Sequence, residues 1–168
     1  MKKILLSLSL CWVLIFSFSL PAFAATSIED VIEEEVVLIQ YFEDGSYIVT
    51  TIYTQSLVID GLQRVGNSQQ VRGGKTDEYY NASHEKVWSY GVAGLFTYDG
   101  VNEAVCIETT DLPLLWGVYE DLWMCADHVS FRTGNRAMGH AEFCLIAYQN
   151  NIYESNVTVT CDKDGNIS

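Results

Sequence analysis

Apolar and polar residues alternate along most of this chain, a pattern typical of half-buried β-strands. It is clearest over residues 87–107, where alternate positions carry Trp88, Tyr90, Val92, Gly94, Phe96 and Tyr98. The run is interrupted by Asp99-Gly100, a dipeptide that favours tight turns. We therefore predict a hairpin with its tip at Asp99-Gly100 and its aromatic side chains in the core.

Two further dipeptides predict hairpins. Asp44-Gly45 separates residues 36–42 from 47–54, and Gly134-Asn135 separates 122–133 from 136–149. If Asp44-Gly45 is a two-residue loop, Val37, Ile39 and Tyr41 face Ile52, Thr50 and Ile48, and we expect this apolar face to meet the core. If Gly134-Asn135 is also a two-residue loop, Thr133 pairs with Arg136. The residue numbers of every further pair of opposed residues in this hairpin then sum to 269.

The remaining segments complete an all-β prediction. Residues 69–80 indicate a poorly alternating edge strand, Pro113 is expected to break the run after Ile107, and residues 152–161 form a last strand. There is no long helical period. We predict an antiparallel β-sandwich with an immunoglobulin-like arrangement, and a small β-barrel as the alternative.

The N-terminus has the pattern of a secretory signal peptide. Lys2 and Lys3 precede an apolar run over residues 4–20, and Ala22 and Ala24 mark a cleavage site after Ala24. We therefore divide the chain into a signal peptide (residues 1–24), an acidic lead-in (25–35) and one β-sandwich domain (36–168). The predicted location is extracellular, with membrane contact only through the signal peptide before cleavage.

The charge narrows the choice of partners. The chain has 22 acidic and 9 basic residues and a formal net charge of −13, and loss of Lys2 and Lys3 with the signal peptide makes it −15. Such a field repels phosphate backbones and anionic lipid surfaces. We expect no nucleic-acid partner, an acidic, soluble monomer, and a protein or glycan as the unknown ligand.

Four cysteines follow the signal peptide, which predicts two disulfides in an exported chain: Cys106, Cys125, Cys144 and Cys161. The pairing around Gly134-Asn135 places Cys125 opposite Cys144, within the reach of a disulfide. We therefore predict Cys125–Cys144, which leaves Cys106 for Cys161.

Several short motifs cover most of the exported part. They are Asp44-Gly45-Ser46-Tyr47-Ile48-Val49-Thr50, Trp88, Phe96-Thr97-Tyr98-x-Gly100 before Cys106, Trp123, Gly134-Asn135-x-Ala137, and Val157-Thr158-Val159-Thr160-Cys161-Asp162-Lys163-Asp164-Gly165-Asn166-Ile167-Ser168. In these the chain resembles a family of small exported proteins of anaerobic Gram-positive bacteria, chiefly clostridia, that carry no assigned activity. The resemblance implies export and a β-rich fold, and it supports pairing of Cys106 with Cys161. It supplies no catalytic residues.

No motif predicts a catalytic, cofactor-binding or metal site. With the pairing set by Gly134-Asn135, His140 lies opposite Val129 and His128 opposite Ala141, so the two imidazoles project from opposite faces and cannot share an ion. Asp127, Glu142 and His140 are a weaker alternative, which we read as a polar strand face. Asp162-Lys163-Asp164-Gly165-Asn166 departs from the spacing of a calcium loop and is read as a terminal turn.

The aromatic cluster after Pro113 is the one candidate for a ligand site: Trp116, Tyr119 and Trp123. Exposed rings on a β-sandwich can stack on sugars, whereas buried rings fill the core. We expect a non-catalytic, secreted interaction or envelope-associated protein. The alternatives are a carbohydrate-binding module that uses this cluster and a secreted hydrolase with two catalytic carboxylates.

Overall fold

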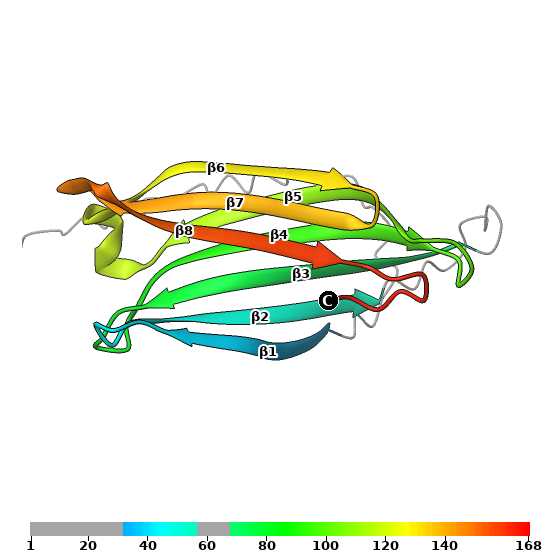
Figure 1. Ribbon diagram of the computed structural model, residues 1–168, viewed down its shortest axis with the longest axis horizontal. Helices are drawn as coiled ribbons and strands as arrows, with labels where there is room; N and C mark the ends of the chain where they lie inside the picture. Colours follow the sequence, from blue (N-terminus) through cyan, green and yellow to red (C-terminus); the bar gives the residue numbers. More distant parts are fainter. Residues whose placement is uncertain (1–31, 57–67) are drawn as a thin grey trace, which may run out of the picture.

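The computed structural model describes residues 32–56 and 68–168, which form two antiparallel sheets packed face to face (Figure 1). The predicted signal peptide (residues 1–24) and residues 25–31 lie outside the described residues. Sheet A has the order β1-β2-β3-β4-β5 and sheet B the order β6-β7-β8. The elements are β1 (Ile32–Tyr41), β2 (Tyr47–Ser56), β3 (Gln69–Tyr80), β4 (Lys86–Tyr98), β5 (Val105–Leu115), η1 (Gly117–Asp121), β6 (Trp123–Thr133), β7 (Arg136–Leu145) and β8 (Tyr148–Thr160).

The predicted β-sandwich is confirmed, and the described strands do not close into a barrel. Within each sheet every strand pairs with its neighbours in sequence, so each sheet is a meander. The immunoglobulin-like connectivity that we expected requires strands to cross between sheets, and it is not found. Short turns join β1 to β2, β3 to β4, β6 to β7 and β7 to β8, and each returns the chain beside the strand it has just left.

The core lies between β4 in sheet A and β7 in sheet B. Trp88, Tyr90 and Phe96 are fully buried, which confirms the core prediction for the aromatic stretch. Trp88 stacks on Phe143 across the two sheets, with ring centroids 4.3 Å apart. Tyr98 is only partly buried and packs at the margin of the core.

The hairpin of residues 87–107 is present, but its loop is longer than predicted. Thr97 is the last residue of β4 paired with β5, opposite Val105, so the loop spans residues 99–104. The Asp99 carboxylate accepts hydrogen bonds from the backbone N–H groups of Val101 and Asn102. These bonds stabilise a six-residue loop in place of a two-residue turn.

Pro113 does not end the strand, contrary to our prediction. It pairs with Tyr90 within β5, which runs on to Leu115. β5 is an edge strand of sheet A, and an edge position tolerates a residue without a backbone N–H group.

The register around Asp44-Gly45 also differs. Asp44 Oδ1 accepts hydrogen bonds from the Ser46 N–H and hydroxyl groups, and Phe42 N–H donates to the Ser46 carbonyl. The loop is therefore residues 42–46, and Tyr41 pairs with Tyr47. The predicted pairs are wrong by one residue, and all the described side chains of β1 are exposed instead of meeting the core.

Two other boundaries are corrected. β1 begins at Ile32, so residues 32–35 of the predicted lead-in belong to the sheet. Residues 69–80 form a central strand, β3, which pairs with both β2 and β4, and not the predicted edge strand. The side-chain alternation of β3 is weak because small residues such as Gly73 and Gly74 accommodate neighbouring side chains, Ile167 and Tyr53 respectively.

The two-residue turn at Gly134-Asn135 is confirmed by the pairing of Thr133 with Arg136. The predicted register holds as far as Asp127 and Glu142, where a β-bulge at Ala126 shifts it by one residue. Cys144 then lies opposite Met124, and Cys125 opposite Phe143.

The register argument for a Cys125–Cys144 disulfide is therefore wrong. Directly opposed residues share a face of the sheet and successive residues alternate, so Cys125 and Cys144 point to opposite faces. All four cysteines of the described residues carry free thiols in this structure.

Cys106 and Cys161 flank the Gly134-Asn135 turn. The Cys106 N–H group donates to the Gly134 carbonyl, and the Cys161 N–H group donates to the Asn135 carbonyl. Both residues are buried in the same core cluster. Burial raises the pKa of the Cys161 thiol to about 11, with further contributions from the charges of Asp162 and Cys106.

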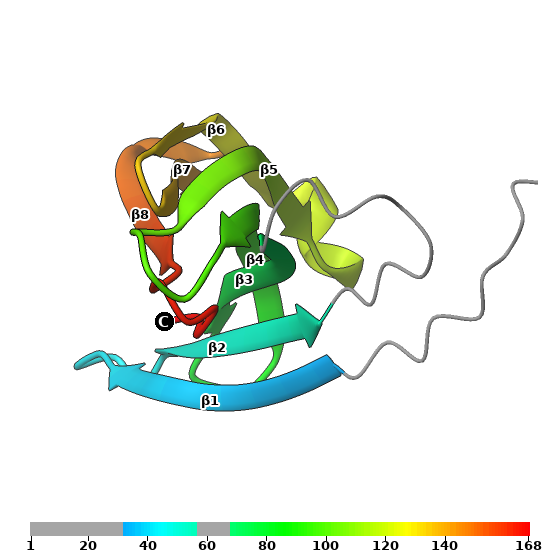
Figure 2. The same ribbon diagram turned by 90° about the vertical axis from the view of Figure 1, so that its right-hand side faces the viewer.

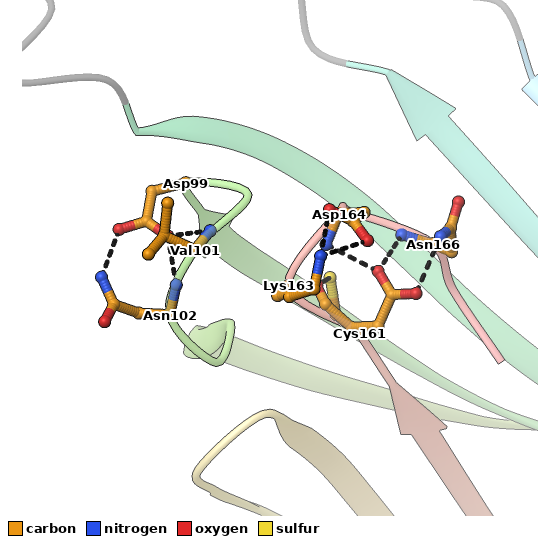
Figure 3. A network of polar contacts seen from close by, with 8 residues as sticks. Asp99, Val101, Asn102, Cys161, Lys163, Asp164 and Asn166 are labelled. Carbon is orange, nitrogen blue, oxygen red and sulfur yellow. Dashed lines mark hydrogen bonds and ion pairs between the residues drawn. The ribbon is translucent and has the colours of Figure 1, made fainter.

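The C-terminal turn folds back on the sandwich (Figures 1 and 3). The Asp162 carboxylate accepts hydrogen bonds from the backbone N–H groups of Asp164 and Asn166, which confirms a terminal turn. Gly100 N–H donates to the Lys163 carbonyl and joins this turn to the β4–β5 loop. Asp99 and Asp162 thus organise the same end of the molecule.

Candidate functional site

A row of aromatic side chains crosses the outer, solvent-facing side of sheet A. Tyr41 pairs with Tyr47, Tyr47 with Tyr80, and Tyr80 with Lys86, so a single rung spans four strands. Trp116 follows β5 and extends the rung beyond Lys86. We call Tyr41, Tyr47, Tyr80 and Trp116 the aromatic row.

The location of the row follows from the hairpin turns. The β1–β2 turn, the β3–β4 turn and η1 lie at one end of the sandwich, on the left of Figure 1. Residues that directly flank these turns are brought onto the same rung, although they are far apart in sequence. The sequence pattern did not identify Tyr41, Tyr47 or Tyr80 as ligand contacts, and it placed Tyr41 on a core-facing side of its strand. The available signal was that each of these residues begins or ends a strand beside a turn.

The ring geometry decides which aromatic faces are free. Tyr47 and Tyr80 are stacked, with centroids 5.0 Å apart and ring planes within 5° of parallel. Tyr41 lies 5.5 Å from Tyr47 at the edge of the sheet and is 71% exposed. Since the inner rings cover each other, the accessible faces are at the two ends of the row.

Lys86 occupies the interval between Tyr80 and Trp116. Its Nζ atom lies 4.5 Å from the centroid of the Trp116 ring and 6.0 Å from that of Tyr80. It also forms an ion pair with Glu78, which accepts a hydrogen bond from the Tyr80 hydroxyl. Burial and this hydrogen bond to Glu78 raise the pKa of Tyr80 to about 12, so the phenol remains protonated at physiological pH.

Trp116, the first of the predicted ligand contacts, forms the second accessible end of the row. Its backbone N–H group donates to the Val87 carbonyl, and its indole Nε1–H donates to Ser89 Oγ at 3.1 Å. These bonds hold the ring in place while leaving the residue 41% exposed. Because the indole N–H group is already hydrogen-bonded to Ser89, the Trp116 ring loses little conformational freedom when it binds a ligand.

Tyr119, the second predicted contact, lies beside Trp116 in a polar cluster. Its hydroxyl accepts a hydrogen bond from Asn81 Nδ2 at 2.7 Å and donates to the Glu85 carboxylate. Hydrogen bonds from Asn81 and Tyr119 lower the pKa of Glu85, which keeps this carboxylate charged. Tyr119 therefore supplies polar groups next to the row and not a free ring face.

Trp123, the third predicted contact, is only 7% exposed and belongs to the core. Its ring packs 5.0 Å from Tyr153 and 5.9 Å from Tyr79, measured between centroids. The prediction is corrected for this residue. Trp123 begins β6 and pairs with Leu145, which packs against the same core.

The histidine prediction is confirmed: His128 lies opposite Ala141 and His140 opposite Val129. His140 contacts Asn156 and Glu142. Within residues 32–56 and 68–168, no three His, Cys, Asp or Glu side chains are grouped to hold a metal ion.

A second polar cluster joins the edges of the two sheets, where β5 lies beside β6 (Figure 2). Asp111 accepts hydrogen bonds from Ser130 Oγ at 2.7 Å, His128 Nδ1 at 2.8 Å and Tyr90 OH at 3.1 Å. Burial opposes a charge on Asp111, but these hydrogen bonds outweigh it and lower its pKa. The sequence analysis missed this cluster because it ended the strand before Pro113.

The Asp111 cluster does not have the geometry of a nucleophilic triad. In a triad the serine hydroxyl donates to a histidine that the aspartate orients. Here Ser130 and His128 each form a hydrogen bond with Asp111. The Ser130 hydroxyl therefore does not donate to His128, as the serine of a triad would. We therefore assign the Asp111 cluster a structural role, in which it joins the edge of sheet A to the edge of sheet B.

No described helix has the length and apolar character needed to cross a bilayer. Comparison with protein-family models, curated proteins and solved structures yields no match. The fold and the row define a β-sandwich with an exposed aromatic surface, and the case for its function therefore depends on its own residues.

Proposed function

We propose that this protein is a non-catalytic, exported binding module that recognises carbohydrate at the aromatic row. The observation that carries the proposal is the exposure of Tyr41 and Trp116 at the two ends of one rung. The outer face of an antiparallel sheet is normally polar. Aromatic residues gathered there mark a surface for binding.

The chemistry of the row suits an uncharged glycan. The free faces of Tyr41 and Trp116 can pack on the C–H groups of a sugar ring, and the neighbouring amide and carboxylates can bond to hydroxyl groups. These polar partners are Glu78, Asn81 and Glu85. The net charge of −13 disfavours anionic polymers.

Tryptophan fluorescence tests the proposal directly. Among Trp88, Trp116 and Trp123, only Trp116 is substantially exposed, so a change in emission on titration reports on the row. We expect neutral oligosaccharides from a glycan panel to shift or quench this emission. Trp116→Ala should abolish the response.

A matched pair of tyrosine variants locates the contact. Tyr41→Ala should weaken glycan binding by about tenfold, since it removes a ring face. Tyr148→Ala, at a residue 66% exposed on β8 of sheet B, should leave the affinity unchanged. Absence of binding to every glycan at millimolar concentration would refute the carbohydrate proposal, and equal losses in the two variants would refute the assignment to the row.

A further inference from the structure

β1 is the outermost strand of sheet A and lies far from sheet B (Figure 2). All the described side chains of this strand are exposed, on both faces of the sheet. Four consecutive apolar residues are 45–55% exposed: Val36, Val37, Leu38 and Ile39. The packing of the described residues therefore leaves this apolar segment open.

The backbone edge of β1 is open as well. β1 pairs with β2 on one side and with no other described strand on the other. Natural edge strands are usually protected by lysine, proline or a bulge. β1 contains neither lysine nor proline, and its bulge at Val37 is the only such feature among its described residues.

The apolar residues lie on both faces of the strand. Val36 pairs with Thr51 and Ile39 with Val49, so both are on the outer face, whereas Leu38 pairs with Thr50 on the inner face. A strand added at this edge would therefore bury apolar area on each side of the sheet. An occupant with alternating apolar and charged residues would not match it.

The charge pattern of β1 identifies the occupant. Glu33, Glu34 and Glu35 stand at one end of the strand, and Gln40 and Tyr41 at the other. In an antiparallel pair of two β1 strands centred on the bulge at Val37 and Leu38, Glu34 of one copy lies opposite Tyr41 of the other on the outer face, and Glu35 opposite Gln40 on the inner face. The phenol and the amide can each donate a hydrogen bond to the facing carboxylate. A parallel pair would place the glutamates against each other.

We propose that two copies of this chain associate by antiparallel pairing of their β1 strands, which joins their five-stranded sheets into one. This replaces the monomer expected from the sequence. The two-fold axis of such a pair is perpendicular to the sheet, so both aromatic rows face the same side. The dimer does not rest on the proposed function, but it would make glycan binding bivalent.

Sedimentation velocity over a range of concentrations tests the dimer. We expect a reversible monomer–dimer equilibrium that tightens with added salt, because screening reduces the repulsion between two chains of charge −13. Val36→Lys and Ile39→Lys should raise the dissociation constant by at least about tenfold. The matched control is Val101→Lys, at a residue 79% exposed in the β4–β5 loop, which should associate like the unmodified protein.

Amide hydrogen exchange of the unmodified protein gives a second test that needs no variant. Exchange in β1 should slow as the protein concentration rises, while exchange in β8 stays constant. A monomer at every concentration, or a dimer that Val36→Lys and Ile39→Lys leave intact, would overturn the proposal. Neither result would affect the glycan titration, so the two proposals fail separately.

Discussion

Trp88 and Phe143 stack across the interface of the two sheets, with ring planes within 5° of parallel. Both residues are fully buried. Phe143→Ala should therefore lower the free energy of unfolding by about 3–5 kcal/mol, since it removes the stack and leaves a cavity. Urea denaturation measures the change. The exposed Val118→Ala should change it by no more than about 0.5 kcal/mol.

Gly139 allows the sheets to approach each other at the centre of the core. A Cβ atom at this position would overlap Tyr90 and Val92 of the opposite sheet. Gly139→Ala should therefore destabilise the protein by about 1–3 kcal/mol. Thermal unfolding gives the measurement. Gly134→Ala is a useful comparison, because the added Cβ would contact no atom. Any loss of stability in this variant would come only from the positive φ of 52°.

Asp111 should make stability depend on pH in the acid range. Its pKa is lowered in the folded protein, so its contribution is present above the ordinary aspartate pKa of about 3.9 and is lost as pH falls through the folded value. Asp111→Asn should cost about 2 kcal/mol at pH 7, because Ser130 and His128 lose a charged acceptor. The difference from the unmodified protein should shrink below about pH 4. A constant difference down to pH 2 would contradict this role.

Cys106 and Cys161 should form a disulfide under oxidising conditions, as the sequence and the family resemblance predict. The two thiols lose two protons and two electrons to an external disulfide or oxygen as the S–S bond forms. Closing a loop of roughly 55 residues would stabilise the chain by about 4 kcal/mol. Non-reducing peptide mapping should show this link, with Cys125 and Cys144 alkylated as thiols. A Cys106–Cys125 link would disprove the assignment.

The pattern of the N-terminus predicts a signal peptide that is cleaved after Ala24. Protein recovered from the culture medium of an expressing Gram-positive host should begin at Ala25, as N-terminal sequencing or intact mass shows. Ala24→Asp should block cleavage, because the site requires a small residue. An unprocessed chain retained in the cell would refute export by this route.

The residue pattern predicted several features that depend only on neighbouring residues. Gly134-Asn135 forms the predicted two-residue turn, and the alternation around Trp88 predicted the buried aromatic core. Local turn chemistry and strand periodicity act over a few residues, so they can be read in order along the chain.

The errors have a common cause. The loop at Asp44-Gly45 and the bulge at Ala126 each shift a register by one residue, and a one-residue shift turns every following side chain to the other face. The argument for Cys125–Cys144 was lost in this way. No signal within a single strand shows where its partner inserts an extra residue.

The sequence by itself determined most of the strands, the positions of the three predicted hairpin turns and the apolar content of the core, because these depend on local conformational preference and on alternation. Only the tertiary structure decided which aromatic residues share a surface. Tyr41, Tyr47, Tyr80 and Trp116 belong to different strands and turns, and the order of strands in the sheet places them on one rung. That juxtaposition depends on pairing between distant segments, and it is the basis of the proposed function.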